Sequence, residues 1–476
     1  MSMGQAKHTA AVGGFLCLLP EHRYRGPVEG GHMEGRRTPP WRYALGMFGM
    51  SIPINMVRGS MLLFYVDILG LDVRAYGIVM AVYAVLDAVD NPLLGHLSDR
   101  TRTRWGRRRP WLVVGAVALT AAFVGFFSAP GGLDGLGLVA WFTVFVLLCE
   151  AADSMYSANY GALLPELYPD EGGRAVANGL RQGFQLVALL LSLALTPVLT
   201  TSVFGTEDTT EGFATTARIY AVVALVALLA MALGVREDPA HSAAERSRLV
   251  PGLLAIARTR LFWTIGIAST CYLAPLALVL AGIQLYVKYS LGLPVASTLM
   301  IQGIVIVVAA GGLAVWTRLV RAHGAPRIWR LAFILLAAGF IPLFLARTLV
   351  EATLAGCVVA AGWSGLLATN DLIQARLLDE DARVHGQHRE ALYLSAFGIF
   401  SRVTGALNGV ALALLGVWFG YWSGDDAGAD PGTAFRVYVA VFPFVLALGG
   451  VVVSHAIRLP GEAGAGRALS GGGGAG

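Results

Sequence analysis

The sequence is poor in charged residues. Only 14% of its 476 residues are Asp, Glu, Lys or Arg, while 56% are hydrophobic and the mean hydropathy is +0.65. A soluble domain carries about 25% charged residues, so this composition excludes an ordinary globular enzyme and favours a membrane protein. Roughly 20 apolar residues make one transmembrane helix, and about twelve such helices with short loops use nearly the whole chain, which leaves no room for a separate catalytic domain.

Cysteine and the familiar catalytic motifs are also scarce or missing. The four cysteines, Cys17, Cys149, Cys271 and Cys357, are far apart and form no CxxC pair, which excludes a disulfide scaffold; we expect the three in apolar stretches to be small buried hydrophobes. The sequence contains no HExxH, no P-loop and no G-x-S-x-G motif. We therefore expect neither an enzyme nor ATP-driven transport, and no cofactor or metal apart from a coupling ion, Na⁺ or H⁺.

Lysine is nearly absent, because 33 of the 35 basic residues are arginine, and these arginines gather in particular loops. The net charge of +5 is therefore not an indication of nucleic-acid binding. Apolar runs between the charged loops predict twelve transmembrane helices. Their expected ranges are 42–68, 74–97, 110–130, 136–164, 176–201, 214–235, 259–288, 296–318, 327–347, 351–378, 390–421 and 434–457.

The arginine distribution predicts the orientation. The loop from Ser98 to Arg109 has six arginines, whereas the stretch from Thr201 to Gly212 has none and is acidic. Arginine-rich and acidic connections alternate along the chain, which by the positive-inside rule places the arginine-rich loops and both termini in the cytoplasm. The predicted fold is an all-α membrane protein with twelve transmembrane helices in two six-helix halves, located in a bacterial inner membrane or its equivalent.

Domain boundaries follow from the one long polar interruption. We expect a disordered extension at 1–40, an N-terminal half at 41–235, a cytoplasmic central loop at 236–258, a C-terminal half at 259–459 and a flexible Gly-rich tail at 460–476. In each half the second helix has glycine near its end and an arginine-rich turn after it, a weak internal repeat typical of secondary transporters. Both Met1 and Met33 remain candidate start residues, because the short apolar run from Ala10 to Pro20 has no clear signal-peptide cleavage site.

Ionisable residues inside the predicted helices are the candidates for function. A charge at the centre of a membrane helix costs about 2.5–3.5 kcal/mol, so such residues are rarely kept without a role. One cluster in these helices sets four acids against three arginines, and if all seven were ionised one negative charge would remain for Na⁺ or a proton to neutralise. They are Asp87, Asp90, Glu150, Asp153, Arg58, Arg181 and Arg402.

Helical spacing places several of these polar groups together. Tyr83, Asp87, Asp90 and Asn91 follow one stripe of the second helix, and Glu150, Asp153, Ser154 and Ser157 share a face of the fourth. Such oxygen-rich faces suit a hard monovalent cation. The acids also have a purely structural interpretation, in which they pair with the three arginines and lock the helices together. The two interpretations are compatible, because an ion pair that breaks in one conformation is itself a gating device.

The segment from Leu86 to Trp111, LDAVDNPLLGHLSDRTRTRWGRRRPW, resembles the signature of the glycoside-pentoside-hexuronide:cation symporters, the melibiose-permease-like branch of the major facilitator superfamily. Further matches follow in order along 41–459, at Ala162 to Leu167, at Arg174 with Asn178 and Arg181, and at Gly386 with Arg389 and Glu390. This resemblance implies a major facilitator fold and an alternating-access symporter that couples Na⁺, Li⁺ or H⁺ to a sugar or glycoside.

The resemblance also implies site residues. Asp87, Asp90, Asn91 and Ser154 match the cation site, with the amide and carboxylate of the middle pair exchanged. On the substrate side the two sugar-binding carboxylates are replaced by Ser51 and Ser157, while Arg181 is retained and Arg402 takes the place of a lysine. We therefore assign the substrate to Ser51, Arg58, Tyr83, Glu150, Asp153, Ser157, Arg181 and Arg402, and regard a different glycoside, or a less polar or anionic solute, as an open alternative.

The basic loop has two interpretations. It either binds anionic lipid and sets the topology, or acts as a cytoplasmic latch, as its resemblance to the superfamily's loop motif implies. We assign gating to Asp99, Arg100, Gly106, Arg107, Arg389 and Glu390. The expected partners are a small-molecule substrate and membrane lipids, with no nucleic acid, and the protein is expected to be a monomer. A proton-coupled exporter, a lipid or amphiphile transporter, and a membrane sensor without transport remain the alternative functions.

Overall fold

The computed structural model describes residues 38–101, 103–168, 171–207, 209–235, 256–385 and 390–456. Several side chains within these ranges are outside the description. Among the predicted site residues they are Asp90, Asn91, Asp99, Arg100 and Glu390, while Arg389 lies outside the described ranges altogether.

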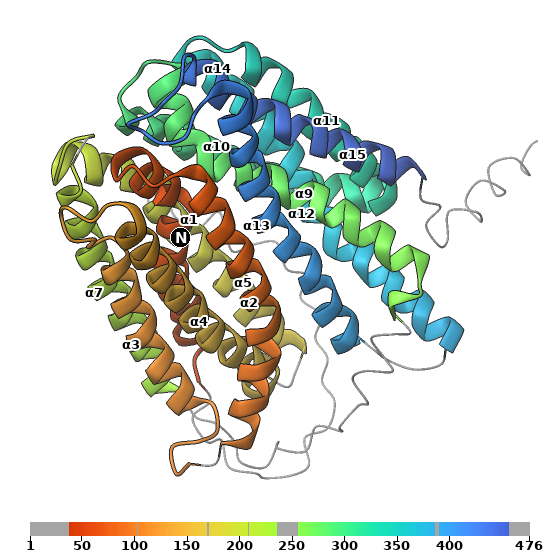
Figure 1. Cartoon of the computed structure of the whole chain (residues 1–476). Helices are drawn as coiled ribbons and strands as arrows, with labels where there is room; N and C mark the ends of the chain where they lie inside the picture. Colours follow the sequence, from red (N-terminus) through yellow and green to blue (C-terminus); the bar gives the residue numbers. More distant parts are fainter. Residues whose placement is uncertain are drawn as a thin grey trace, which may run out of the picture. The chain divides into compact units, whose positions relative to one another are not determined.

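The described chain is almost entirely helical (Figure 1). Several long helices contain a short π-helical segment, labelled η, without a break in the span; η6 is instead a single 3-10 turn that leads into α10. The elements are α1 Pro40–Met61 with η1 Leu62–Ile68, α2 Val73–Arg100, α3 Arg109–Phe126, α4 Gly135–Leu167, α5 Glu171–Leu189 with η2 Leu190–Leu195, α6 Thr196–Val198 and η3 Leu199–Val203, α7 Glu211–Gly234, α9 Arg260–Leu285 with η5 Tyr286–Ser290, η6 Val295–Ser297 with α10 Thr298–His323, α11 Ala325–Leu345, α12 Leu349–His385, α13 Glu390–Phe419, and α14 Pro431–Arg436 with η7 Val437–Val441 and α15 Phe442–Ala456.

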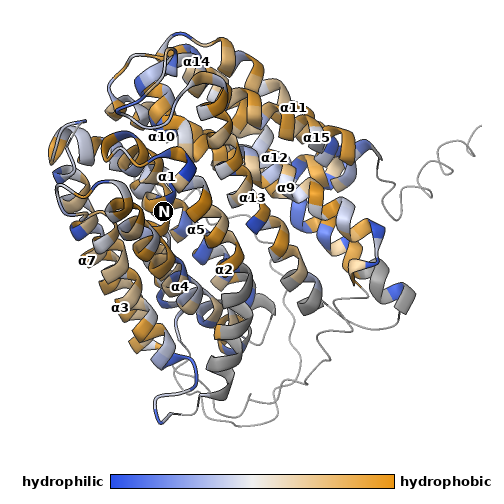
Figure 2. Cartoon of the chain, viewed as in Figure 1, coloured by the Kyte–Doolittle hydropathy of each residue, from blue (hydrophilic) through white to orange (hydrophobic). Residues whose placement is uncertain are grey.

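These elements form twelve helical spans in the described chain, which confirms the predicted all-α membrane fold. Eleven of them are long and apolar enough to cross a bilayer, and hydrophobic residues dominate helices such as α3 and α11 in Figure 2. The twelfth span, α2, carries Asp87, Asp90 and Asn91, and many of its side chains are outside the described residues. The chain is therefore a multi-pass membrane protein.

The predicted helix ranges agree with the observed ones to within seven residues at every end. The largest difference is at α12, which continues to His385 rather than ending at Leu378, because its last turns are polar but contain no helix-breaking Gly or Pro. The helix α10 ends later than predicted, at His323, where Gly324 adopts φ +82 and Pro326 starts the next helix. Apolar length thus predicted the membrane segment, while capping residues decide where each helix stops.

The helix connections define two sides. Arg104, Arg107 and Arg327 belong to what we call the basic side, whereas Asp134, Glu207 and Asp425 belong to the acidic side. At the acidic side Asp430 caps α14, and its hydrogen bonds from Thr433 hold the pKa of the Asp430 carboxyl below its ordinary value. The predicted cytoplasmic location of the basic side stays a prediction.

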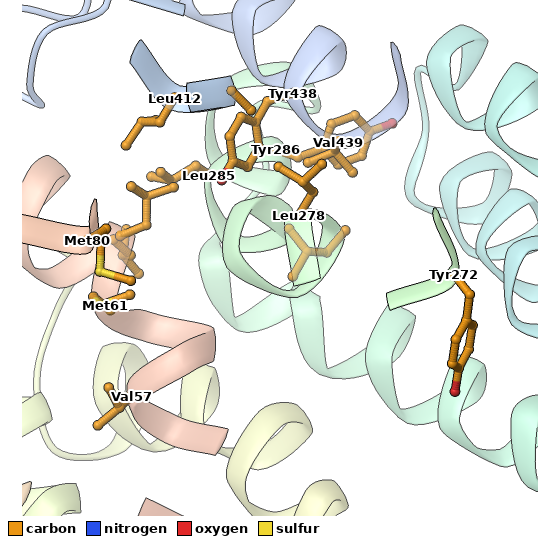
Figure 3. Packing of buried hydrophobic residues seen from close by; sticks show 14 of the residues in the cluster. Val57, Met61, Met80, Tyr272, Leu278, Leu285, Tyr286, Leu412, Tyr438 and Val439 are labelled. Carbon is orange, nitrogen blue, oxygen red and sulfur yellow. The ribbon is translucent and has the colours of Figure 1, made fainter. Parts of the chain in front are cut away.

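Helices α1, α3, α4, α5 and α7 pack among themselves, as do α9, α10, α11, α12 and α15. The two groups meet where α2 packs against α13, side by side in Figure 1, and where α10 contacts η2. One buried hydrophobic cluster joins the groups and includes Met61 and Met80 from the first and Leu285 and Leu412 from the second (Figure 3). The predicted domain boundaries at 236–258 and beyond 456 fall largely outside the described residues and stay predictions.

Glycines permit close helix approach between α11 and α12. A Cβ on Gly362 would lie 2.4 Å from the backbone nitrogen of Leu336, and one on Gly339 would lie 2.8 Å from that of Val359. Small residues at such crossings are how membrane helices gain packing energy, since lipid provides no hydrophobic drive for helix association. Backbone atoms cannot move aside as a flexible side chain can.

Gly362→Ala is therefore expected to lower the stability of the folded protein by about 1–3 kcal/mol through overpacking. Thermal unfolding of the detergent-purified protein, followed by fluorescence, measures the shift. Gly311→Ala on α10 is the matched control, since Gly311 is exposed and a Cβ there meets nothing within 4 Å. Equal melting temperatures for the two variants would contradict close backbone packing at this crossing.

Candidate functional site: a charged cluster between the helices

Arg58 lies in the last turn of α1, which continues into η1, and interacts with polar groups of two other helices, α2 and α4. It forms a hydrogen bond with Tyr83 of α2 and is close enough to Glu150 and Asp153 of α4 for electrostatic attraction. The Tyr83 hydroxyl donates a hydrogen bond to Glu150 Oε2. Arg58 is solvent-accessible although the neighbouring Val57 and Gly59 are buried. Because its partners come from α2 and α4, this accessible surface faces the interior of the helix bundle rather than lipid.

Glu150 is the buried centre of this cluster. The residue is 8% exposed and also lies close enough to Asp87 and Asp153 for charge repulsion. The three carboxylates Asp87, Glu150 and Asp153 lie near two guanidiniums, Arg58 and Arg402, which leaves one excess negative charge in a region of low dielectric constant if all are ionised; this is costly unless a cation or a proton neutralises it. The structure thus brings together the predicted residues Arg58, Tyr83, Glu150 and Asp153.

Asp87 connects this cluster to the second group of helices. Its Oδ1 lies 3.3 Å from Nε of Arg402 on α13, and both side chains are mostly buried, at 21% and 15% exposed. The pair lies near the middle of both α2 and α13 and crosses the boundary between the two groups. Any ligand that neutralises Asp87 therefore weakens a direct link between the halves.

The predicted serines lie on the same helices. Ser154 is buried, and its hydroxyl donates a 3.5 Å hydrogen bond to Glu150 Oε1; Ser157 donates to the Ser154 carbonyl oxygen at 3.4 Å. Ser51 is buried in α1. The Asp90 and Asn91 side chains are outside the described residues, so the four-residue cation site stays a prediction. Within the described part of the chain, no three Asp, Glu, His or Cys side chains are grouped to hold a metal ion.

Arg181 belongs to a different set of contacts. Its guanidinium donates to the hydroxyl of Tyr43, whose ring stacks on Tyr160 with centroids 4.4 Å apart. Tyr43 precedes Arg58 by fifteen positions on α1, which corresponds to about 22 Å of helix rise. In this conformation Arg181 is therefore held apart from the cluster around Arg58, although sequence reasoning had placed both on one substrate.

The basic loop after α2 is anchored to α4. Gly106 adopts φ +109, which favours glycine, and its amide donates to the Thr103 carbonyl oxygen in a tight turn. Arg107 and Arg108 then both bind Glu166 Oε1, each at 2.8 Å. These bonds hold the loop to its own half. The side chains of Asp99, Arg100, Arg389 and Glu390 are outside the described residues, so the latch stays a prediction.

Sequence reasoning missed a second charged cluster, which joins the two halves at the acidic side. Asp67, at the end of the first span, has a side chain that is 0% exposed; it accepts bonds from Lys288 Nζ at 2.6 Å, from Tyr289 at 2.5 Å and from Tyr421 at 3.2 Å. The composition held a signal for this cluster, because Lys288 is one of only two lysines in the chain.

Other contacts between the halves lie at the same side. The Gly424 amide donates to the Val66 carbonyl oxygen at 2.9 Å, Glu207 accepts from the Val295 amide at 2.6 Å, and Gln284 donates to Ser60 at 3.2 Å. Arg74 stacks over Trp422 at 3.9 Å. With Asp67 and its partners, these residues form what we call the acidic-side seal, and the structure is therefore closed at this side.

The comparisons with known proteins identify the family. A family model described as MFS/sugar transport protein matches residues 42–461. The chain belongs to this family. That membership confirms the resemblance to the major facilitator superfamily inferred from the loop after α2.

Individual relatives are similar over parts of their length. An uncharacterized symporter of Synechocystis sp. is 30% identical over 46% of this chain and 41% of its own. A lactose permease of Leuconostoc lactis is 23% identical over 80% of this chain and 62% of its own. This chain therefore spans less than two thirds of either protein. A putative 2,3-dihydroxypropane-1-sulfonate exporter of Salmonella typhimurium is 25% identical over 85% of this chain and 89% of its own.

Solved structures support the fold alone, since their sequence identities are low. A bacterial homolog of the human lysosomal transporter Spinster, in an inward-facing conformation, superposes with a TM-score of 0.64 at 13% identity and covers 87% of this chain and 94% of its own. The nucleoside transporter NupG gives 0.63 at 11% identity, over 88% of this chain and 99% of its own. The twelve spans thus have the major facilitator arrangement.

Proposed function

We propose that this protein is a secondary transporter that couples Na⁺ or H⁺ to symport of a sugar or glycoside by alternating access. The observation that carries this proposal is the charged cluster around Glu150, because it is buried, rich in carboxylates and connected through Asp87 and Arg402 to the other half. The family match and the lactose permease relative support a sugar-like solute.

In the proposed mechanism, cation binding and the Arg402 contact compete for Asp87. A cation at Asp87 neutralises the carboxylate and loosens the ion pair between α2 and α13, while Tyr83 and Arg58 keep Glu150 oriented toward the solute. Binding of cation and solute together then favours the occluded state, since the cation neutralises buried carboxylate charge and the hydroxyl groups of the solute pair with the remaining buried polar groups. The acidic-side seal must open before the site can exchange with the other compartment.

The direct test is uptake into proteoliposomes. A tenfold inward cation gradient corresponds to about 1.4 kcal/mol, enough for up to tenfold accumulation of a solute at 1:1 coupling. We expect accumulation of at least one sugar or glycoside to follow an imposed Na⁺ or pH gradient and to stop when an ionophore dissipates it. Solute equilibration that ignores both gradients would contradict coupled symport.

A second candidate is export of a small polyhydroxylated anion. The long match to the putative sulfonate exporter favours it, as does the presence of Ser51 and Ser157 where the resemblance to melibiose permease implies sugar-binding carboxylates. An anionic solute would find its counter-charge in Arg58. Counterflow assays with a neutral glycoside and a three-carbon polyol sulfonate, in right-side-out and inverted vesicles, separate the two candidates by solute and by direction.

A further inference from the structure

A polar cavity opens at the acidic side, away from the charged cluster. Its volume is about 390 Å³, and it lies between the residues that follow α3 and the first two turns of α7. Ser128 lines it from the first segment, and Thr210, Glu211, Thr215 and Arg218 line it from the second. Both elements belong to the same half, so opening and closing between the halves does not build or remove this cavity.

Two opposite charges line the cavity without neutralising each other. Glu211 and Arg218 are both exposed, and within the described residues neither forms a hydrogen bond through its side chain or an ion pair. They are seven positions apart, so they lie on one face of α7, two turns and about 10.5 Å apart along its axis. The buried hydroxyl oxygen of Ser128 likewise has no hydrogen-bond partner in the described chain.

Below Arg218 the same face of α7 is apolar and exposed. Val222 and Val226 follow at helical spacing, with 63% and 64% of their surfaces accessible. Since α7 is a membrane span, this surface contacts hydrocarbon. An arginine at the top of such a stripe directs its guanidinium toward the headgroup region, where lipid phosphates lie within its reach.

We propose that this cavity binds one zwitterionic phospholipid with a primary ammonium headgroup. Arg218 donates hydrogen bonds to the phosphodiester, Glu211 accepts from the ammonium group, and an acyl chain follows Val222 and Val226. An anionic headgroup satisfies Arg218 but is repelled by Glu211, and a quaternary ammonium headgroup offers Glu211 no N–H donor. The charge pattern therefore selects phosphatidylethanolamine chemistry over phosphatidylglycerol and phosphatidylcholine.

Native mass spectrometry of the delipidated full-length protein tests this proposal. Titration with phosphatidylethanolamine, phosphatidylcholine and phosphatidylglycerol of identical chains is expected to show one retained phosphatidylethanolamine, bound about tenfold more tightly than the other two. Arg218→Gln is expected to weaken phosphatidylethanolamine about tenfold, as loss of a charge-assisted hydrogen bond predicts. Glu211→Gln is expected to remove the preference over phosphatidylcholine while retaining binding.

Arg347→Gln is the matched control, because Arg347 is also an exposed arginine at the acidic side but does not line the cavity. It is expected to leave the lipid profile unchanged. Equal lipid retention in Arg218→Gln and Arg347→Gln would overturn the proposal. Soluble phosphoethanolamine distinguishes a lipid from a free phosphate ligand: displacement of the lipid only at far higher concentration supports the lipid site, and binding as tight as that of the lipid overturns it.

Discussion

Lys288→Met is expected to reduce transport at least tenfold by opening the acidic-side seal. The Asp67 side chain is fully buried and Lys288 is its only cationic partner among the described residues. Removing one member of a buried pair leaves an uncompensated charge, at a cost of about 3–5 kcal/mol. Two tyrosine hydroxyls remain on Asp67 but carry no positive charge. This cost falls on the closed seal, because Asp67 becomes hydrated when the halves separate there.

Cysteine accessibility measures this shift directly. Ser60 is 1% exposed and is a member of the seal seven positions before Asp67 on the first span, where it accepts a hydrogen bond from Gln284. Ser60→Cys is expected to resist a membrane-impermeant thiol reagent added at the acidic side and to become reactive when Lys288→Met is added. Asp67→Asn combined with Lys288→Met removes both charges and is expected to recover part of the protection and transport. Unchanged labelling in the single Lys288 variant would show that the pair does not hold the seal.

The positions of the helices and the family could be predicted from the sequence, because both depend on local information. Apolar runs end at arginine-rich turns, so helix positions follow from hydropathy within a few residues. The segment from Leu86 to Trp111 carries the family signature in contiguous residues. Spacing on one helix also placed Tyr83 with Asp87 and Glu150 with Ser154, and the structure keeps Glu150 in contact with Tyr83 and Ser154.

The pairing of charges between helices could not be predicted from the sequence. The sequence shows four acids and three arginines but not which acid each arginine meets. In the structure Arg402 takes Asp87, Arg58 lies among Glu150, Asp153 and Tyr83, and Arg181 turns to Tyr43. Asp67 and Lys288 are 221 positions apart, so no periodicity relates them. Such contacts depend on how separate helices pack against one another, which a single sequence does not encode locally.

Two ion pairs connect the halves, and they lie at different depths along the spans. This difference indicates how they act together. Asp67 and Lys288 lie at the acidic-side ends of their spans, whereas Asp87 and Arg402 lie near the middle of theirs. The outer contact requires only that the halves approach. The central one also depends on the charge state of the cluster around Glu150, so it is the contact through which cation occupancy changes the relation between the halves.

Asp87→Asn is therefore expected to abolish cation coupling while allowing solute movement. The amide cannot bind a proton or neutralise a cation, so the gradient no longer changes the contact between α2 and α13. Accumulation driven by a tenfold Na⁺ or pH gradient is expected to fall from up to tenfold to none, while exchange of labelled for unlabelled solute continues.

Asp72→Asn is the matched control for this substitution. Asp72 caps the same helix by accepting a hydrogen bond from the Arg74 amide at 2.6 Å, and asparagine caps equally well. Because both substitutions make the same chemical change on α2, loss of coupling in the first alone assigns coupling to the central carboxylate. Concentrative uptake that survives Asp87→Asn would exclude this residue from the cation site and leave its pair with Arg402 a purely structural one.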